Sequence, residues 1–169
     1  MAAGEASDTL MSMAQIASAF AGFSALVSAL KERASRGESL HDILRLRVVT
    51  STSVVVVAAS LVPVGLANFG LSDRVVWGLS AAFLLALNYG VLLSFVRSWQ
   101  PVRDRFPPDR LAVTLVGLLE LLDQAALVTI LLNLLPGLDY ALYLAALVCN
   151  VCQAAFVLLR FVGSEFSVR

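Results

Sequence analysis

Residues 48–72 read VVTSTSVVVVAASLVPVGLANFGLS and carry no charged side chain over 25 residues. A bilayer core about 30 Å thick is crossed by roughly 20 helical residues, so this stretch predicts a transmembrane helix. Transmembrane β-strands are shorter and alternate apolar with polar residues, a pattern that the run Val54–Val57 breaks. The stretch therefore favours an all-α membrane protein.

The rest of the chain contains four further apolar stretches. Three are free of charge, at 9–30, 75–96 and 140–159, and a fourth, 111–135, contains Glu120 and Asp123. The 169 residues are 59% hydrophobic and 14% charged, with a net charge of zero. This composition argues against a soluble enzyme domain and against a nucleic-acid partner. We predict a polytopic transmembrane helix bundle that forms a single domain over residues 1–169, with spans at about 9–30, 48–71, 75–97, 111–135 and 139–161.

The first predicted helix has a bulky stripe and a face of small residues. An interfacial helix would have a strongly charged face, and residues 9–30 have none, so we favour a span. If this helix lies on the membrane surface instead, four spans remain. Small residues let transmembrane helices approach closely, and we expect Ala14, Ser18 and Gly22 to pack against other helices.

The distribution of cations predicts the orientation. Eleven of the twelve Lys and Arg residues flank the first and third connections or follow the last helix, and Arg74 alone belongs to the other side. Because basic loops stay in the cytoplasm, the N-terminus is expected outside and the C-terminus in the cytoplasm of a bacterial inner membrane.

Both membrane interfaces have candidate contact residues. On the cytoplasmic side, cationic and aromatic side chains of the third connection are expected to contact lipid headgroups or a cytoplasmic protein partner: Arg97, Trp99, Arg103, Arg105 and Arg110. On the outer side, Trp77, Tyr140 and Tyr143 are expected to form an aromatic belt.

The fourth span contains the most informative polar residues. Glu120, Asp123 and Gln124 share one helical face because they are spaced at i, i+3 and i+4. An acid at mid-membrane costs about 2.5–3.5 kcal/mol on insertion scales, so something must compensate. A rise of 1.5 Å per residue places Asn88, Asn150 and Gln153 at a similar depth, a layer without Lys, Arg or His. Three solutions are open: protonated acids, acids hydrogen-bonded by the amides, or acids that face water and bind a passing cation.

Two classes of function follow from these observations. The first is a homo-oligomeric cation or proton channel, or a conducting subunit, whose ion pathway uses the acids and amides of the fourth span and its neighbours. The same groups could instead only hold helices together. The second class is a non-conducting adaptor that recruits a cytoplasmic partner through the basic loops. No catalytic residue, metal site or cofactor is expected.

Two resemblances complete the sequence evidence. Cys149 and Cys152 form a C-x-x-C pair similar to that of quinone-coupled thiol oxidoreductases, but the chain lacks their second cysteine pair, so helix packing is the favoured role. Residues 14–27, AQIASAFAGFSALV, followed by residues 44–47 and a Ser/Thr cluster, resemble small bacterial multi-pass inner-membrane proteins of uncharacterised function. That resemblance covers the first third of the chain and implies a membrane location, with no activity to transfer.

Overall fold

The computed structural model describes the backbone of residues 3–34, 40–100 and 110–166, and the side chains within 5–29, 46–100 and 110–163. Within these residues the chain forms five helices and no strand: α1 (Ala3–Ala34), α2 (Leu40–Ala67), α3 (Asp73–Trp99), α4 (Arg110–Leu131) and α5 (Asp139–Phe166). Each of them is long and apolar enough to cross a membrane. The predicted all-α, multi-pass membrane architecture is therefore confirmed.

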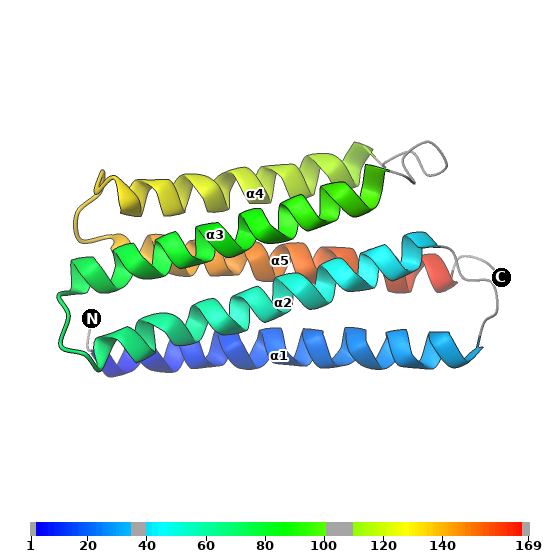
Figure 1. The fold of residues 1–169 in the computed structure, drawn as a ribbon, viewed down its shortest axis with the longest axis horizontal. Coiled ribbons are helices and arrows are strands. Elements are labelled where there is room, and N and C mark those ends of the chain that lie inside the picture. Colours follow the sequence, from blue (N-terminus) through cyan, green and yellow to red (C-terminus); the bar gives the residue numbers. More distant parts are fainter. Residues whose placement is uncertain (1–2, 35–39, 101–109, 167–169) are drawn as a thin grey trace.

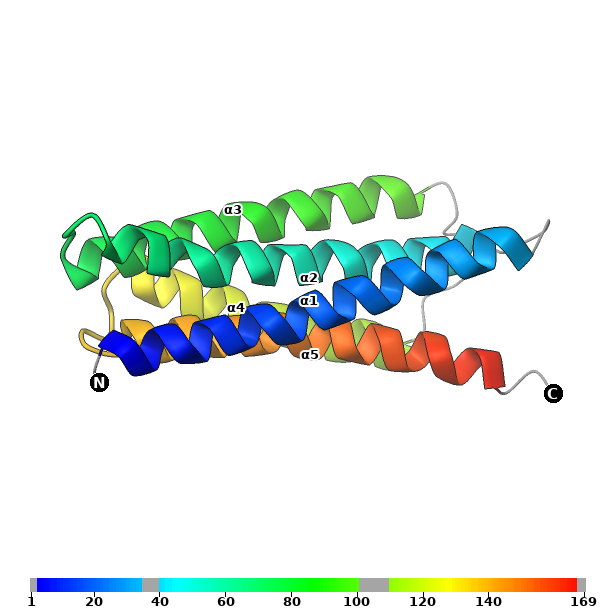
Figure 2. The ribbon, with the colours of Figure 1, turned by 90° about the horizontal axis from the view of Figure 1, so that it is seen from below.

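The helices run along one common axis, and successive helices alternate in direction (Figure 1). α2 and α5 lie centrally: α2 packs against α1, α3 and α5, and α5 also packs against α4. α4 is peripheral, since only 11% of its span is buried, against 44% for α2. α1 follows the other helices lengthwise and crosses them at a shallow angle (Figure 2). This is the arrangement of a fifth span, because an interfacial helix would lie across the bundle axis.

The bundle has two chemically different ends. α1, α3 and α5 finish, and α2 and α4 begin, at the same end (Figure 1). We call it the basic end, because Arg47, Arg97, Arg110 and Arg160 belong to the helix segments there. The opposite end holds Arg74, at the start of α3.

α4 finishes before the predicted span does. The helix ends at Leu131, whereas the sequence predicted a span to residue 135. Asn133 has a φ of 55°, in the left-handed region that closes helices. Its backbone N–H donates to the Ile130 carbonyl, and the N–H of Leu134 donates to the Thr129 carbonyl, both at 3.1 Å. These bonds reverse the chain after Leu131 and leave the Ile130 carbonyl, through its second lone pair, and the Leu131 carbonyl able to accept further donors.

Arg74 supplies those donors. Its guanidinium donates to the carbonyl of Ile130 and, at 3.0 Å, to that of Leu131, at the negative end of the α4 dipole. The Asp139 carboxylate lies 3.7 Å from Nη1 of the same guanidinium. The one cation that departs from the predicted charge bias therefore joins the start of α3 to the end of α4 and the start of α5.

The larger apolar cluster, which we call the apolar core, occupies the half of the bundle nearer Arg74 and includes Leu84, Leu127, Ile130 and Leu147, all fully buried. A smaller cluster of Val49, Ala154 and Leu158 lies toward the basic end. Tyr143 belongs to the apolar core as well: it is fully buried, and its hydroxyl donates to the Ala59 carbonyl at 2.8 Å. The prediction that Tyr143 belongs to an interfacial aromatic belt is therefore wrong. Trp77 and Tyr140 do lie beside it near that end, with ring centroids 5.4 Å apart.

The rotation of α1 differs in part from the prediction. Ala14 is buried, but Ser18 and Gly22 are exposed, and a Cβ built on Gly22 would meet no atom within 4 Å. The buried face runs through Ala14, Ala17 and Ser24 instead. Ser24 and Thr50 of α2 share a hydrogen bond of 2.7 Å between their hydroxyls. Both lipid and the neighbouring helices are apolar, so small side chains alone do not determine which face of α1 packs inward. The hydrogen bond between Ser24 and Thr50 favours the rotation that is observed.

Candidate functional site: an intramembrane acidic network

The deepest polar contact joins α3 to α4. Asp123 is fully buried, and Nδ2 of Asn88 donates to its Oδ2 at 2.6 Å. Asn150 of α5 faces the same carboxyl group, while its own Nδ2 donates to the Ala146 carbonyl at 3.1 Å. Side chains from three helices therefore converge on Asp123 in the middle of the bundle.

The second oxygen of this carboxyl group is unusual. Asp123 Oδ1 is buried and has no hydrogen-bond partner among the described residues. Leaving a buried acceptor unpaired costs about 1–3 kcal/mol, and more if the group is charged. The oxygen is therefore a chemically suitable position for a bound proton, which would neutralise the charge, or for a small cation, which would pair with it.

A second acid–amide cluster lies one helical turn nearer the basic end. Glu120 accepts a hydrogen bond from Gln124 of its own helix at 2.9 Å through Oε1. Its Oε2 accepts another from Gln153 of α5 at 3.2 Å. Glu120 and Gln124 are partly buried, so this cluster is less enclosed than Asp123.

The structure brings all six predicted polar residues together. Both acids receive amide donors, which matches the second of the three solutions that the sequence left open. Within the described part of the chain no ion pair involves Glu120 or Asp123. Two hydroxyls of α2 have other neighbours: Thr50 bonds to Ser24 of α1, and Ser51 faces a groove toward α3.

The two sides of the network differ in polarity. Toward Arg74 it is followed by the apolar core, in which Leu127 and Tyr143 lie one to two turns from Asp123 and Asn150 along their own helices. Toward the basic end it continues into the partly exposed Glu120 cluster. The apolar core therefore borders Asp123 on the Arg74 side, and amides and a second acid follow it toward the basic end, beside the smaller cluster of Val49, Ala154 and Leu158.

The structure describes three of the five residues that are predicted to contact lipid or a protein partner. Arg97 and Arg110 are exposed, and Trp99 stacks on Phe95 with ring centroids 5.8 Å apart. Arg103 and Arg105 lie outside the described residues. The aromatic stack places the indole at the basic end of α3, where an interfacial anchor is expected.

The cysteine pair takes no part in the network's hydrogen bonds. Cys149 is partly buried and Cys152 exposed, and both are free thiols in the middle part of α5. Thiols in apolar surroundings are usually inert, so this position gives no support to an oxidoreductase.

Sequence reasoning missed one feature, an open groove between α2 and α3 that is lined in part by Ala86, Gly90 and Ser94. Their spacing at i, i+4 and i+8 was the available signal, since it places three small residues on one helical face. Comparison with known protein families, with curated proteins and with solved structures finds no match to this chain.

Proposed function

We propose that the protein conducts protons or small cations across a bacterial inner membrane, with Asp123 as the central group of the pathway. One observation carries the proposal: a fully buried carboxyl group, at mid-membrane depth, has one oxygen paired to an amide and the other unpaired. Ionisable residues inside membranes are costly and typically mark ion or proton pathways.

In this proposal Glu120 connects Asp123 to the basic end. The two acids lie at i and i+3 on one face of α4, which makes them successive groups of the proposed pathway. Gln124 and Gln153 orient the Glu120 carboxylate through its two oxygens, and Asn88 orients Asp123. Amide donors thus hold each acid in place, and the other acid is the next polar group on the same face of α4.

The apolar core serves as the closed gate of the proposed pathway. Leu127 and Ile130 of α4 and Tyr143 of α5 are fully buried between Asp123 and the Arg74 end. A charge crosses such a region only when water enters it, because hydrocarbon offers no hydrogen bonds. Conduction therefore requires these side chains to move apart.

The proposed pathway runs inside one protomer. Asp123 is buried by its own chain, so it does not face a symmetry axis that several copies would share. Assembly into a homo-oligomer stays a separate prediction, and chemical crosslinking in native membranes would measure it.

We place the basic end in the cytoplasm, following the positive-inside rule. The exception, Arg74, is engaged by two carbonyls and a carboxylate, which supports a structural role for this charge. Single cysteines at Ser72 and Gln100, in a background without native cysteines, test the orientation. An impermeant maleimide applied to intact cells should label the cysteine at position 72 and spare that at position 100; the reverse pattern would invert the topology.

Flux in liposomes tests the function. The purified protein should carry protons or monovalent cations down an imposed gradient, and the pair Glu120→Gln with Asp123→Asn should abolish the flux. These isosteric changes keep the side-chain volumes, and Asp8→Asn, at an exposed acid outside the network, is the matched control. A parent protein with no more flux than empty liposomes, or a double variant with full flux, would refute the proposal and leave the network as a structural link between helices.

A further inference from the structure

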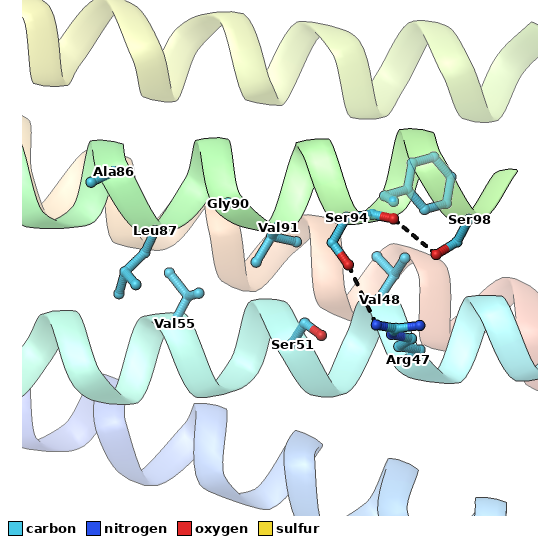
Figure 3. Close-up of a pocket in the computed structure, with 11 residues that line it drawn as sticks. Arg47, Val48, Ser51, Val55, Ala86, Leu87, Gly90, Val91, Ser94 and Ser98 are labelled. Carbon is cyan, nitrogen blue, oxygen red and sulfur yellow. Dashed lines mark hydrogen bonds between the residues drawn. The ribbon is translucent and has the colours of Figure 1, made fainter. Parts of the chain in front are cut away.

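A groove lies between α2 and α3, separate from the acidic network (Figure 3). Its cavity volume is about 280 Å³. Each of its two walls uses residues spaced at i, i+4 and i+8. These residues are Arg47, Ser51 and Val55 on α2, and Ala86, Gly90 and Ser94 on α3. Such spacing gives two parallel stripes, so the groove extends along both helices.

The groove stays open although small residues line it. In close-packed transmembrane pairs, small residues let the two backbones approach. Here Gly90 is exposed, and a Cβ added to it would meet no atom within 4 Å. The small side chains of α3 therefore leave space that the protein itself does not fill, and that space opens toward the surrounding lipid.

Polarity changes along the groove. At the basic end, Nη2 of Arg47 donates to Oγ of Ser94 across a long 3.4 Å, and the Ser98 hydroxyl donates to the Ser94 carbonyl at 2.9 Å. Farther along, Val55 and Leu87 point toward one another (Figure 3). Among the residues whose side chains are described, no carboxylate lies within ion-pair distance of Arg47. The groove thus combines a cation at one end with an apolar channel.

We propose that this groove binds an anionic phospholipid, with its phosphate at Arg47 and Ser94 and one acyl chain lying along Gly90 toward Val55. The charge argues for this occupant, since a guanidinium and neighbouring hydroxyls are suited to phosphate oxygens. The size argues against a helix of a partner protein, because two turns of a helix about 10 Å in diameter occupy roughly 800 Å³, more than the cavity of about 280 Å³. This proposal does not depend on ion conduction.

Native mass spectrometry of the delipidated protein in neutral detergent tests the headgroup. Dioleoyl phosphatidylglycerol should bind as one saturable copy, and dioleoyl phosphatidylcholine should bind more weakly. Arg47→Gln should weaken phosphatidylglycerol binding about tenfold, the factor for one charge-assisted hydrogen bond. Arg47→Lys should restore part of it. The control, Arg97→Gln, removes an exposed cation from the same end that does not line the groove, and should change the affinity little.

A second pair of variants tests the acyl chain. Gly90→Leu fills the groove and should abolish the bound lipid, whereas Gly117→Leu adds the same side chain to open space on α4 and should not. Equal affinity for both lipids, equal losses in the Arg47 and Arg97 variants, or undiminished binding in Gly90→Leu would overturn the proposal. So would a shift of the Gly90→Leu protein to a smaller oligomer without loss of lipid, since the groove would then hold another copy of the chain. Glycerol phosphate that competes as strongly as the lipid would exclude the acyl chain from the site.

Discussion

Replacing Asn88 by alanine removes the hydrogen bond that holds the buried Asp123 carboxyl group. The donor and acceptor atoms are 2.6 Å apart, and both side chains are buried. Hydrogen bonds to charged groups contribute about 1.5–3 kcal/mol in proteins, while interhelical bonds in membranes average about 0.6 and reach about 1.7 kcal/mol. Because Asp123 would then have both oxygens unpaired, we expect Asn88→Ala to cost about 1.5 kcal/mol, near the upper membrane value.

A double-mutant cycle isolates this interaction from other effects of the substitution. Once Asp123→Ala has removed the acid, Asn88→Ala should cost about 0.5 kcal/mol or less, so the coupling free energy should be about 1 kcal/mol. The assay is the unfolding free energy of the four proteins in mixed micelles, measured by steric trapping. Gln153→Ala provides a comparison: its bond to Glu120 is longer, at 3.2 Å, and the acceptor is partly exposed.

The two variants should differ in their cost to stability. Gln153→Ala should cost less than about 0.6 kcal/mol, the average for interhelical hydrogen bonds. If Asn88→Ala costs the same with and without Asp123, the hydrogen bond does not stabilise the bundle. If Gln153→Ala costs as much as Asn88→Ala, burial does not control the strength of these bonds.

Three further predictions concern the Arg74 end of the bundle. Arg74→Gln should lower the unfolding free energy by about 1–2 kcal/mol, because two α4 carbonyls lose their guanidinium donor. Asp139→Asn should lower it by under about 1 kcal/mol. Equal costs in micelle unfolding would contradict this. Tyr143→Phe should lower stability by about 1 kcal/mol through the lost bond to Ala59, and an unchanged melting temperature would argue against it. Leu127→Ala should cost about 2–4 kcal/mol and, if the core is the gate, raise liposome flux; reduced flux in folded protein would exclude that gate.

The positions of the helices and of their acids were predictable because charge is expensive in a membrane. The long charge-free windows identified the helices, and the spacing of Glu120 and Asp123 placed both acids on one face. Counting residues from the basic ends then placed Asn88, Asn150 and Gln153 near them. The depth predictions use distance along a helix axis, which the constant helical rise determines, and the shared face of the two acids uses the helical period within one helix.

Rotation about the axis was harder to predict, for a physical reason. In a soluble protein the polar face of a helix identifies its outer side, but in a membrane both sides of a helix are apolar. Ser18 and Gly22 were therefore expected to pack and are exposed, and Tyr143 was expected at the interface and is in the core. The partners of Arg74 and Thr50 depend on such rotations too, since each bond joins two different helices.

The order of the helices along the chain also has a consequence for biosynthesis. A chain made from its N-terminus delivers α3, with Asn88, to the membrane before α4 arrives with its two acids. Asp123 therefore meets its donor at once. Glu120 must wait for Gln153 until α5 follows, but Gln124 on its own helix accompanies it from the start. At every stage of insertion, each acid has an amide within reach.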